Sequence, residues 1–232
     1  MSLNIFGDIA GEYKTLMALK EKMPKGIPVS VGDMPDRGKD SYNVIEFFRE
    51  NGRAVLGNHE HMMLDFLKDT GKYDGGVWFQ NGGRETLMSY FRRKYGFNYQ
   101  FGVHDYEDFI SCVPVNHIKY LESLPLFIED ESEHGKILIT HAPINPVVGL
   151  EKACKNVSEQ MGGAYSVIWN RGKPKAIEGV KLQIHGHNAS HQVEWFGRAD
   201  NNFAVCLDTC RAKVLTGMHW PSMEIFQQDF ID

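Results

Sequence analysis

The sequence contains little of what marks secreted, membrane-spanning or disulfide-stapled proteins. Only 4 of its 232 residues are cysteines, and their spacing forms no disulfide framework. Cys206 and Cys210 lie close together, but no second close pair completes a structural zinc site, so we interpret them as small buried residues. No apolar run approaches the length of a membrane span, and the N-terminal residues lack the charged and apolar regions of a signal peptide. We therefore expect a soluble, cytoplasmic protein.

The chain also has no surplus of positive charge. It carries 25 Lys and Arg residues against 30 Asp and Glu residues, a formal charge of −5. This balance argues against nucleic acids and anionic membranes as partners, because both require a basic surface. It is compatible with a local cationic pocket, since bound metal ions add charge that the count ignores. The composition, with 42% hydrophobic residues, is that of an ordinary globular protein, and we expect a single domain over residues 1–232.

Short apolar runs recur along the chain and predict buried strands. Those of strand length are Leu3–Phe6, Ile27–Val31, Ala54–Leu56, Ile137–Thr140, Val180–His185 and Phe203–Leu207. Between the early runs, apolar residues recur with helical spacing over residues 13–23 and 44–48, and Asp40 or Ser41 is a suitable N-cap for the second helix. This alternation of strands and helices predicts an α/β layered fold.

Residues 61–135 follow a different pattern, which is helical and rich in aromatic residues. We interpret them as a helical insertion that packs against one side of the site. Their Gly-Gly pairs at 75–76 and 82–83 predict turns, because neither has the spacing of a phosphate-binding loop. The aromatic residues around Trp78 and Tyr90 are typical of a core.

The polar residues that follow the apolar runs are those that bind divalent metal ions. They are Asp8, Asp33, Asn58, His141 and His187. In α/β folds, ligands bind beyond the carboxyl ends of the strands, so these side chains are expected to converge. Two divalent ions can clamp phosphoryl oxygens and generate a hydroxide nucleophile, with a carboxylate bridging them and Asn and His completing shells suited to Mn, Fe or Zn. An imidazole can protonate the leaving oxygen and arginines can grip the remaining oxygens.

Two motifs make this interpretation specific. Residues 32–38 read GDMPDRG, and residues 57–60 read GNHE. With these motifs the chain resembles the calcineurin-like metallophosphoesterases, and within them the phosphoprotein phosphatases of the bacterial and phage (lambda-type) branch. The resemblance runs from Gly7 to about Leu215 and includes residues 7–11, 140–142, 169–171 and 186–188.

The resemblance implies a fold and a role for each site residue. The implied fold consists of two packed, mixed β-sheets flanked by helices. The implied cofactor is a pair of divalent ions, with Mn preferred and Fe, Zn or Mg as alternatives. Asp8 would bind the first ion, Asp33 would bridge both, and the second would be completed by Asn58, His141 and His187. The proton donor would be His59, oriented by Asp36. The phosphate would be held by Arg37 and Arg171.

The first motif departs from the family pattern. The resemblance places a metal-binding histidine at position 10, where this chain has Ala10. We therefore expect a weaker first metal site, with His185 or Glu12 as possible substitute ligands. Asp208 is interpreted as a turn cap or as a support for a ligand, in preference to a metal ligand. Cys210 and Arg211 also depart from the glycine-rich sequence usual at that point of the family.

Three functions are compatible with this pattern. The first is a serine/threonine-type protein phosphatase acting on phosphorylated proteins, peptides or small phosphomonoesters, which the intact Asp36-Arg37-Gly38 element favours. The second is a hydrolase of dinucleoside polyphosphates or other nucleotides. The third is a phosphate-binding or regulatory protein weakened by the loss at Ala10, against which the retention of His59 and Asp36 argues. The sequence carries no signal for an oligomeric state.

Overall fold

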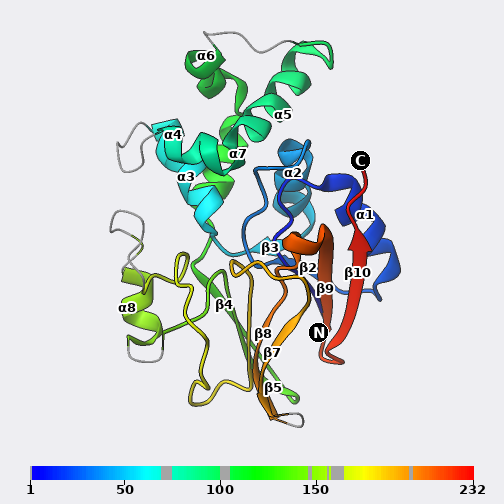
Figure 1. The fold of residues 1–232 in the computed structure, drawn as a ribbon, viewed down its shortest axis with the longest axis vertical. Helices are drawn as coiled ribbons and strands as arrows, with labels where there is room; N and C mark the ends of the chain where they lie inside the picture. Colours follow the sequence, from blue (N-terminus) through cyan, green and yellow to red (C-terminus); the bar gives the residue numbers. More distant parts are fainter. Residues whose placement is uncertain are drawn as a thin grey trace.

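The strands form two five-stranded sheets in the computed structural model, which describes residues 2–68, 75–99, 105–145, 148–155, 157, 165–198 and 201–232 (Figure 1). The first sheet has the order β10-β9-β1-β2-β3. Its strands are β1 (Leu3–Phe6), β2 (Ile27–Ser30), β3 (Arg53–Ala54), β9 (Val214–Trp220) and β10 (Glu224–Asp229). β1, β2 and β3 are parallel, while β9 and β10 are antiparallel to their neighbours.

The second sheet is also mixed and has the order β4-β5-β6-β8-β7. Its strands are β4 (Phe127–Ser132), β5 (Gly135–Thr140), β6 (Leu182–His185), β7 (Glu194–Arg198) and β8 (Asn201–Cys206). The three central strands are parallel, and the two edge strands run antiparallel to them. The carboxyl ends of β5, β6 and β8 therefore lie at the same end of the sheet, which is where ligands bind in α/β folds.

The two sheets pack face to face through alternating apolar side chains. Leu3 and Ile5 of β1 belong to the same buried cluster as Ile137 and Ile139 of β5, so this cluster is the layer between the sheets. On the outer face of the first sheet, a second cluster joins Phe6 to α1 (Tyr13–Lys22) and α2 (Ser41–Asn51). Asp40 caps α2 by accepting the N–H of Asn43 at 3.3 Å, as the sequence predicts. The expected pair of packed mixed sheets with flanking helices is confirmed.

The helices between β3 and β4 gather at one end of the molecule, beyond the strands (Figure 1). They are α3 (Asn58–Lys68), α4 (Gly75–Trp78), a π-helical turn (Phe79–Gly83), α5 (Arg84–Tyr95), α6 (Asp105–Cys112) and α7 (Val115–Glu122). Two further short helices are α8 (Gly149–Lys155) and a 3₁₀ turn (Cys210–Ala212). Among the described helices, none has the length and apolarity to cross a membrane.

The expected end of the helical insertion at residue 135 is wrong. The helices end at Glu122, and β4 occupies Phe127–Ser132. β4 is an edge strand that pairs with β5, and Ile128 is its single buried residue. Its exposed positions carry acidic residues, so it has no apolar run by which the sequence could reveal it.

Candidate metal and phosphate site

The five predicted metal ligands come together from both sheets. Each follows the carboxyl end of a strand, and none is more than 5% exposed. The strands β1, β2 and β3 lead to Asp8, Asp33 and Asn58, while β5 and β6 lead to His141 and His187. The site therefore lies where the carboxyl ends of the parallel strands of both sheets meet, as the alternation of strands and helices predicts.

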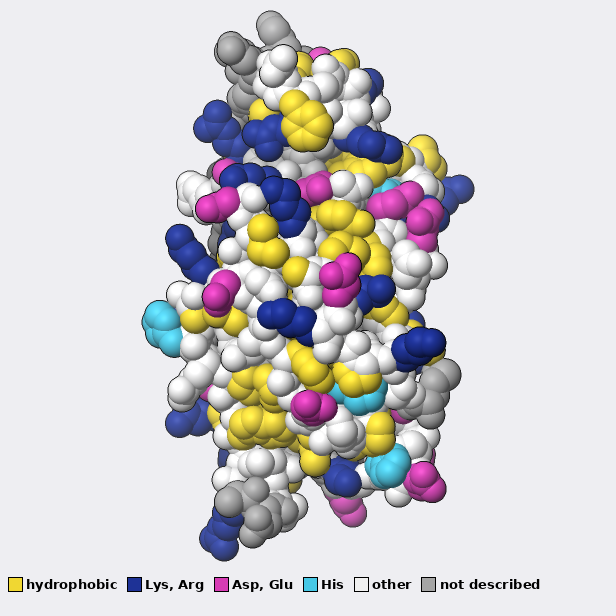
Figure 2. Space-filling view, turned by 90° about the vertical axis from the view of Figure 1, so that its right-hand side faces the viewer, with side chains coloured by type: hydrophobic (Ala, Val, Ile, Leu, Met, Phe, Trp, Pro, Cys, Tyr) yellow, Lys and Arg dark blue, Asp and Glu magenta, His cyan; other side chains and the backbone are white. Residues whose placement is uncertain are grey.

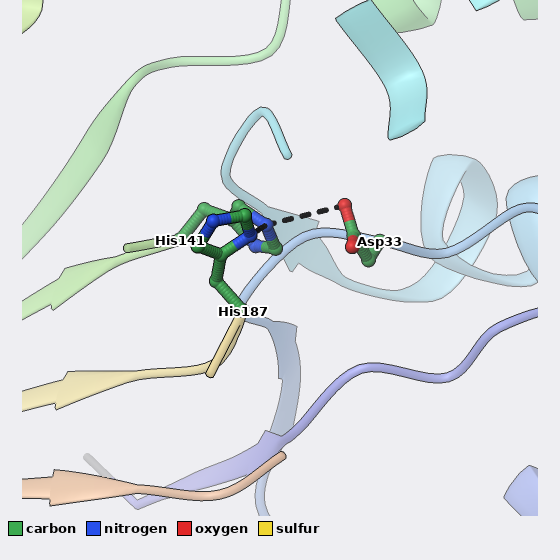
Figure 3. Close-up of side chains that lie close together, drawn as sticks. All are labelled: Asp33, His141 and His187. Atoms are coloured by element: carbon green, nitrogen blue, oxygen red, sulfur yellow. Dashed lines mark hydrogen bonds and ion pairs between the residues drawn. The ribbon is translucent and has the colours of Figure 1, made fainter. Parts of the chain in front are cut away.

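The centre of this site is a buried group of metal-binding side chains. Ligand atoms of Asp33, His141 and His187 all lie within 4.8 Å of one another, and Figure 3 shows both imidazoles at their strand ends beside the Asp33 carboxylate. The Nε2 atom of His141 lies 2.9 Å from Asn58 Oδ1, 3.2 Å from His187 Nδ1 and 3.3 Å from Asp33 Oδ1. So many acceptor atoms converging on one point are suited to a cation.

The protonation of the two histidines fits a metal site. Burial lowers the pKa of His141, and burial together with the neighbouring His141 lowers that of His187. Neutral imidazoles keep the lone pair that a metal ion needs. His141 Nδ1 lies 2.9 Å from the carbonyl oxygen of Val31, a contact that directs Nε2 into the site.

The carboxylates of the site differ in charge state. Burial alone would raise the pKa of Asp33, but His141 and His59 outweigh it, and the pKa is held at about 2. An ionised carboxylate beside two imidazoles suits the bridging role that the resemblance implies for Asp33. Burial and the neighbouring carboxylates of Asp208 and Asp33 raise the pKa of Asp8 well above its usual range. A divalent cation between these groups would remove that repulsion.

The loops that carry the site are conformationally unusual. Asp33, Asp36, Arg37 and His187 all have positive φ angles of 53°, 75°, 63° and 65°, a region that non-glycine residues rarely adopt. Each such residue costs about 1–3 kcal/mol and persists where the surrounding structure enforces it. Gly32 has a φ of 97°, and a Cβ atom there would lie 2.9 Å from His141 Nδ1. Residue 32 must therefore be a glycine, because the loop after β2 packs there against His141, which follows β5.

His59 and Asp36 form a buried pair beside the metal ligands. His59 Nδ1 lies 2.5 Å from Asp36 Oδ2, and its Nε2 lies 3.1 Å from Arg37 Nη2. Burial would lower the pKa of His59, but Asp33 and Asp36 outweigh it and raise the pKa. An imidazole with a raised pKa and a fixed orientation is suited to proton donation.

Sequence reasoning missed the residues that hold Asp36. Trp78 Nε1 donates to both carboxylate oxygens of Asp36, at 3.2 and 3.0 Å, and Thr86 Oγ1 donates to Oδ1 at 2.6 Å. Ser41 and Thr86 also accept the N–H of Asp36. Trp78 is buried in the core, as predicted, but it also orients Asp36, the carboxylate that holds His59. The sequence shows no signal for this role because Trp78 and Thr86 lie far from Asp36 along the chain.

Glu60 is a second missed residue, although it belongs to the GNHE motif. Its Oε2 atom accepts the N–H groups of Gly57 at 2.9 Å and Asp33 at 3.0 Å, and Oε1 accepts that of Met34 at 2.6 Å. Burial and the charge of Asp33 raise the pKa of Glu60 to about 8. Its carboxyl group joins the two motif loops, so that Asp33 and Asn58 share one support.

Replacing Thr86 by valine tests the support of Asp36. Thr86→Val keeps the shape of the side chain but removes one hydrogen bond to the carboxylate and an acceptor for its N–H group. We expect a loss of about 1–3 kcal/mol in the free energy of unfolding, together with a lower kcat, because His59 loses its fixed orientation. Urea unfolding and turnover of a phosphoserine peptide measure the two effects.

Thr15→Val is the matched control for this change. Thr15 is also fully buried, and its Oγ1 accepts the N–H of Ile231 at 2.9 Å, a contact that involves neither Asp36 nor His59. It should lower stability without lowering kcat. Equal kcat values for the two variants would contradict the role given to Thr86.

The remaining predicted residues lie at the margin of the site. Arg171 Nη1 donates to the carbonyl oxygen of His187 at 3.4 Å, which places its guanidinium next to this predicted metal ligand. Of the two expected substitute ligands, Glu12 interacts with Lys39 and Thr15, and His185 stacks on Phe196 with its Nδ1 atom 3.0 Å from the carbonyl oxygen of Gly186. Neither belongs to the group of metal-binding atoms among the described residues.

Comparisons with known proteins agree with this geometry. Serine/threonine-protein phosphatase 2 of Escherichia coli (strain K12) is 38% identical over 84 residues, which make up 34% of this chain and 37% of that protein. The match thus spans little more than a third of that relative. The asymmetrical bis(5'-nucleosyl)-tetraphosphatase PrpE of Geobacillus thermodenitrificans (strain NG80-2) is 25% identical over 263 aligned positions, covering 96% of this chain and 92% of that protein.

Solved structures share the fold at low sequence identity. A structure described as a candidate diadenosine tetraphosphatase has a TM-score of 0.64 at 19% identity and covers 97% of this chain and 92% of that one. A cold-active protein-tyrosine phosphatase of a Shewanella species has a TM-score of 0.55 at 18% identity and covers 94% and 75%. The family model for calcineurin-like phosphoesterases matches residues 1–200. With its Asp and His metal-binding group, this chain therefore belongs to the calcineurin-like phosphoesterase family of enzymes.

Proposed function

We propose that this enzyme hydrolyses phosphomonoesters and that phosphorylated serine and threonine side chains are its substrates. The observation that carries the proposal is the His59–Asp36 pair, whose 2.5 Å contact lies beside Arg37 and the Asp33 metal ligand. A serine alkoxide is a poor leaving group that needs a proton as the P–O bond breaks. A buried imidazole with its own carboxylate supplies that proton.

Each side chain has a task that follows from its position. Two divalent ions, proposed to be Mn, would supply Lewis acidity and a nucleophile derived from water when they are held by Asp8, Asp33, Asn58, His141 and His187. Arg37 and Arg171 would hold the phosphate oxygens that are not transferred, since guanidinium groups bind such oxygens in pairs. His59 would protonate the departing oxygen, and Asp36 would keep its ring in place.

A substrate panel tests the proposal. Initial rates would be measured with Mn on p-nitrophenyl phosphate, phosphoserine and phosphotyrosine peptides, and diadenosine tetraphosphate. We expect hydrolysis of p-nitrophenyl phosphate and the phosphoserine peptide. Hydrolysis of diadenosine tetraphosphate with a kcat/KM well above that of every phosphopeptide would contradict the proposed substrate class.

A second candidate is the hydrolysis of dinucleoside polyphosphates, and a cavity favours it. The lining of a cavity of about 1100 Å³ includes Ala10 and Arg37, so the cavity lies next to the site. Its described lining includes seven basic side chains against three acidic ones: Lys14, Arg37, Lys39, Arg92, Arg93, Arg211 and Lys213. Figure 2 shows the face towards α1 and β10, where Lys and Arg side chains are interspersed with hydrophobic ones. Such a lining suits a ligand with several phosphates and an aromatic base.

Arg211 offers the sharpest test of this second candidate. It lines this cavity and also a smaller one that contains Arg171. If the cavity binds further phosphates, Arg211→Ala should lower kcat/KM on diadenosine tetraphosphate by about tenfold or more, the worth of one charge-assisted hydrogen bond. Turnover of p-nitrophenyl phosphate should stay unchanged, because this substrate has a single phosphate.

Arg53→Ala is the matched control, since Arg53 is an exposed arginine on β3 that lines neither cavity. It should affect neither substrate. Equal losses on both substrates in Arg211→Ala would mean that Arg211 acts on the scissile phosphate and that the cavity does not select polyphosphates.

A further inference from the structure

Position 10 leaves the first metal site short of a ligand. The backbone around Ala10 is held next to the site, since its N–H donates to the carbonyl oxygen of Asp33 at 2.9 Å and its carbonyl accepts the N–H of Gly38 at 2.8 Å. Its φ angle of 50° lies in the left-handed region. The side chain is nevertheless a methyl group, which coordinates nothing. A divalent ion next to Asp8 and Asp33 therefore needs a donor from another part of the chain.

The strand register identifies where that donor lies. β8 pairs with β6 in parallel, and His185 is the register partner of Cys206. Two residues further along each strand stand His187, a predicted metal ligand, and Asp208. The N–H of Leu207 donates to the carbonyl oxygen of His185 at 2.8 Å, so the pairing continues past the strand ends. Asp208 and His187 therefore follow the ends of two neighbouring parallel strands, β8 and β6.

The Asp208 carboxyl group is directed at Asp8. The two carboxyl groups are close neighbours, and both residues are buried, at 2% and 4% exposure. Asp208 Oδ1 also accepts the N–H of Cys210 at 3.1 Å, and both oxygens of Asp8 accept the N–H of His187 at 3.2 Å. These contacts hold the two carboxyl groups against each other beside Asp33.

The carboxyl groups of Asp8 and Asp208 have no basic side chain as a partner in the described part of the chain. Within the described ranges, neither Asp8 nor Asp208 forms an ion pair with a Lys or Arg side chain. Two neighbouring, buried carboxyl groups offer oxygen donors of the kind that bind a divalent cation. A metal ion bound by both would hold them together.

We propose that Asp208 is a ligand of the first metal ion and supplies the donor that Ala10 lacks. The first ion would then be held by the carboxylates of Asp8, Asp33 and Asp208, while the second keeps the nitrogen donors of His141 and His187. Oxygen donors suit Mn and Mg, whereas imidazole also suits Zn and Fe. The inference rests on the two-metal site of the proposed function, but metal binding can be measured without any substrate.

Calorimetric titration of the full chain, freed of metal, with Mn tests this assignment. Asp208→Asn retains the oxygen that accepts the N–H of Cys210 and removes the charge. We expect two Mn ions for each wild-type chain and one for Asp208→Asn, with the affinity of the remaining ion unchanged within about twofold. Unchanged binding of two ions by Asp208→Asn would overturn the proposal, as would a wild-type chain that binds one ion only.

A second variant restores the missing ligand. In the Asp208→Asn background, Ala10→His should recover binding of the second Mn ion, because histidine tolerates left-handed φ angles and offers a nitrogen donor. Glu12→Gln, which changes the nearby carboxylate that interacts with Lys39, should leave both ions bound. Loss of one ion in Glu12→Gln instead would assign the donor to Glu12 and overturn the role of Asp208.

Thermal unfolding without metal shows whether Asp208→Asn folds. If it does not fold, Ala10→His alone provides the test. In an otherwise wild-type chain, Ala10→His should then raise the affinity of the first ion by less than about threefold, since a ligand already occupies the position. An increase of about tenfold or more, which is the smallest effect usual even for the outer-shell partners of a metal ligand, would show an open position and contradict the proposal. Neither affinity measurement depends on hydrolysis of any substrate.

Discussion

Asp33→Asn is expected to lower kcat by at least about a hundredfold, equivalent to roughly 2.7 kcal/mol of transition-state stabilisation. Asp33 lies within 4.8 Å of the ligand atoms of His141 and His187, and its N–H is held by Glu60. In the proposed mechanism it bridges both ions, so the amide removes a charge from both metal sites at once. Initial rates on p-nitrophenyl phosphate over a range of Mn concentrations measure the effect.

Asp229→Asn provides the control for this change, because Asp229 is an exposed carboxylate on β10. It should retain wild-type turnover. A folded Asp33→Asn protein with near wild-type kcat in saturating Mn would contradict the assignment of Asp33 as the bridging ligand.

His59→Asn is expected to damage the hydrolysis of a phosphoserine peptide much more than that of p-nitrophenyl phosphate. General acids contribute about a hundredfold to ten-thousandfold where the leaving group needs a proton. Nitrophenolate leaves without one, so its loss should be about tenfold or less. The measurement is kcat on both substrates for each variant, at saturating Mn.

An exposed histidine gives the matched control. His134 is about half exposed in the loop between β4 and β5, and His134→Asn should change neither rate. Equal losses on both substrates in His59→Asn would count against proton donation and favour a role in binding phosphate.

The sequence allowed the convergence of the metal ligands to be predicted because buried parallel strands are short apolar runs. Such runs precede Asp8, Asp33, His141 and His187. In α/β folds, ligands bind where the carboxyl ends of the strands meet. Three strands that were not predicted lack an uninterrupted apolar run. β7 has no buried residue, and β10 mixes exposed with half-buried residues. β9 is mostly buried, but Thr216, Gly217 and His219 interrupt its apolar residues.

The supports of the site could not be predicted, since they depend on contacts between distant segments. Thr86 lies 50 residues from Asp36, and Trp78 lies 42 residues from it. A threonine or tryptophan in a helix is common, and nothing local marks it as a partner of a buried carboxylate. Asp208 was visible as the residue after an apolar run, but its contact with Asp8 arises only from the pairing of β6 with β8.

The most direct test of the two-metal phosphoesterase is to follow the activity of the wild-type chain as metal is removed and returned. After chelation and dialysis, the protein should show no turnover of p-nitrophenyl phosphate above background. Titration with Mn should restore turnover in step with the binding of two ions for each chain. Undiminished hydrolysis by protein shown to be free of metal would contradict the account, as would full binding of Mn without any hydrolysis.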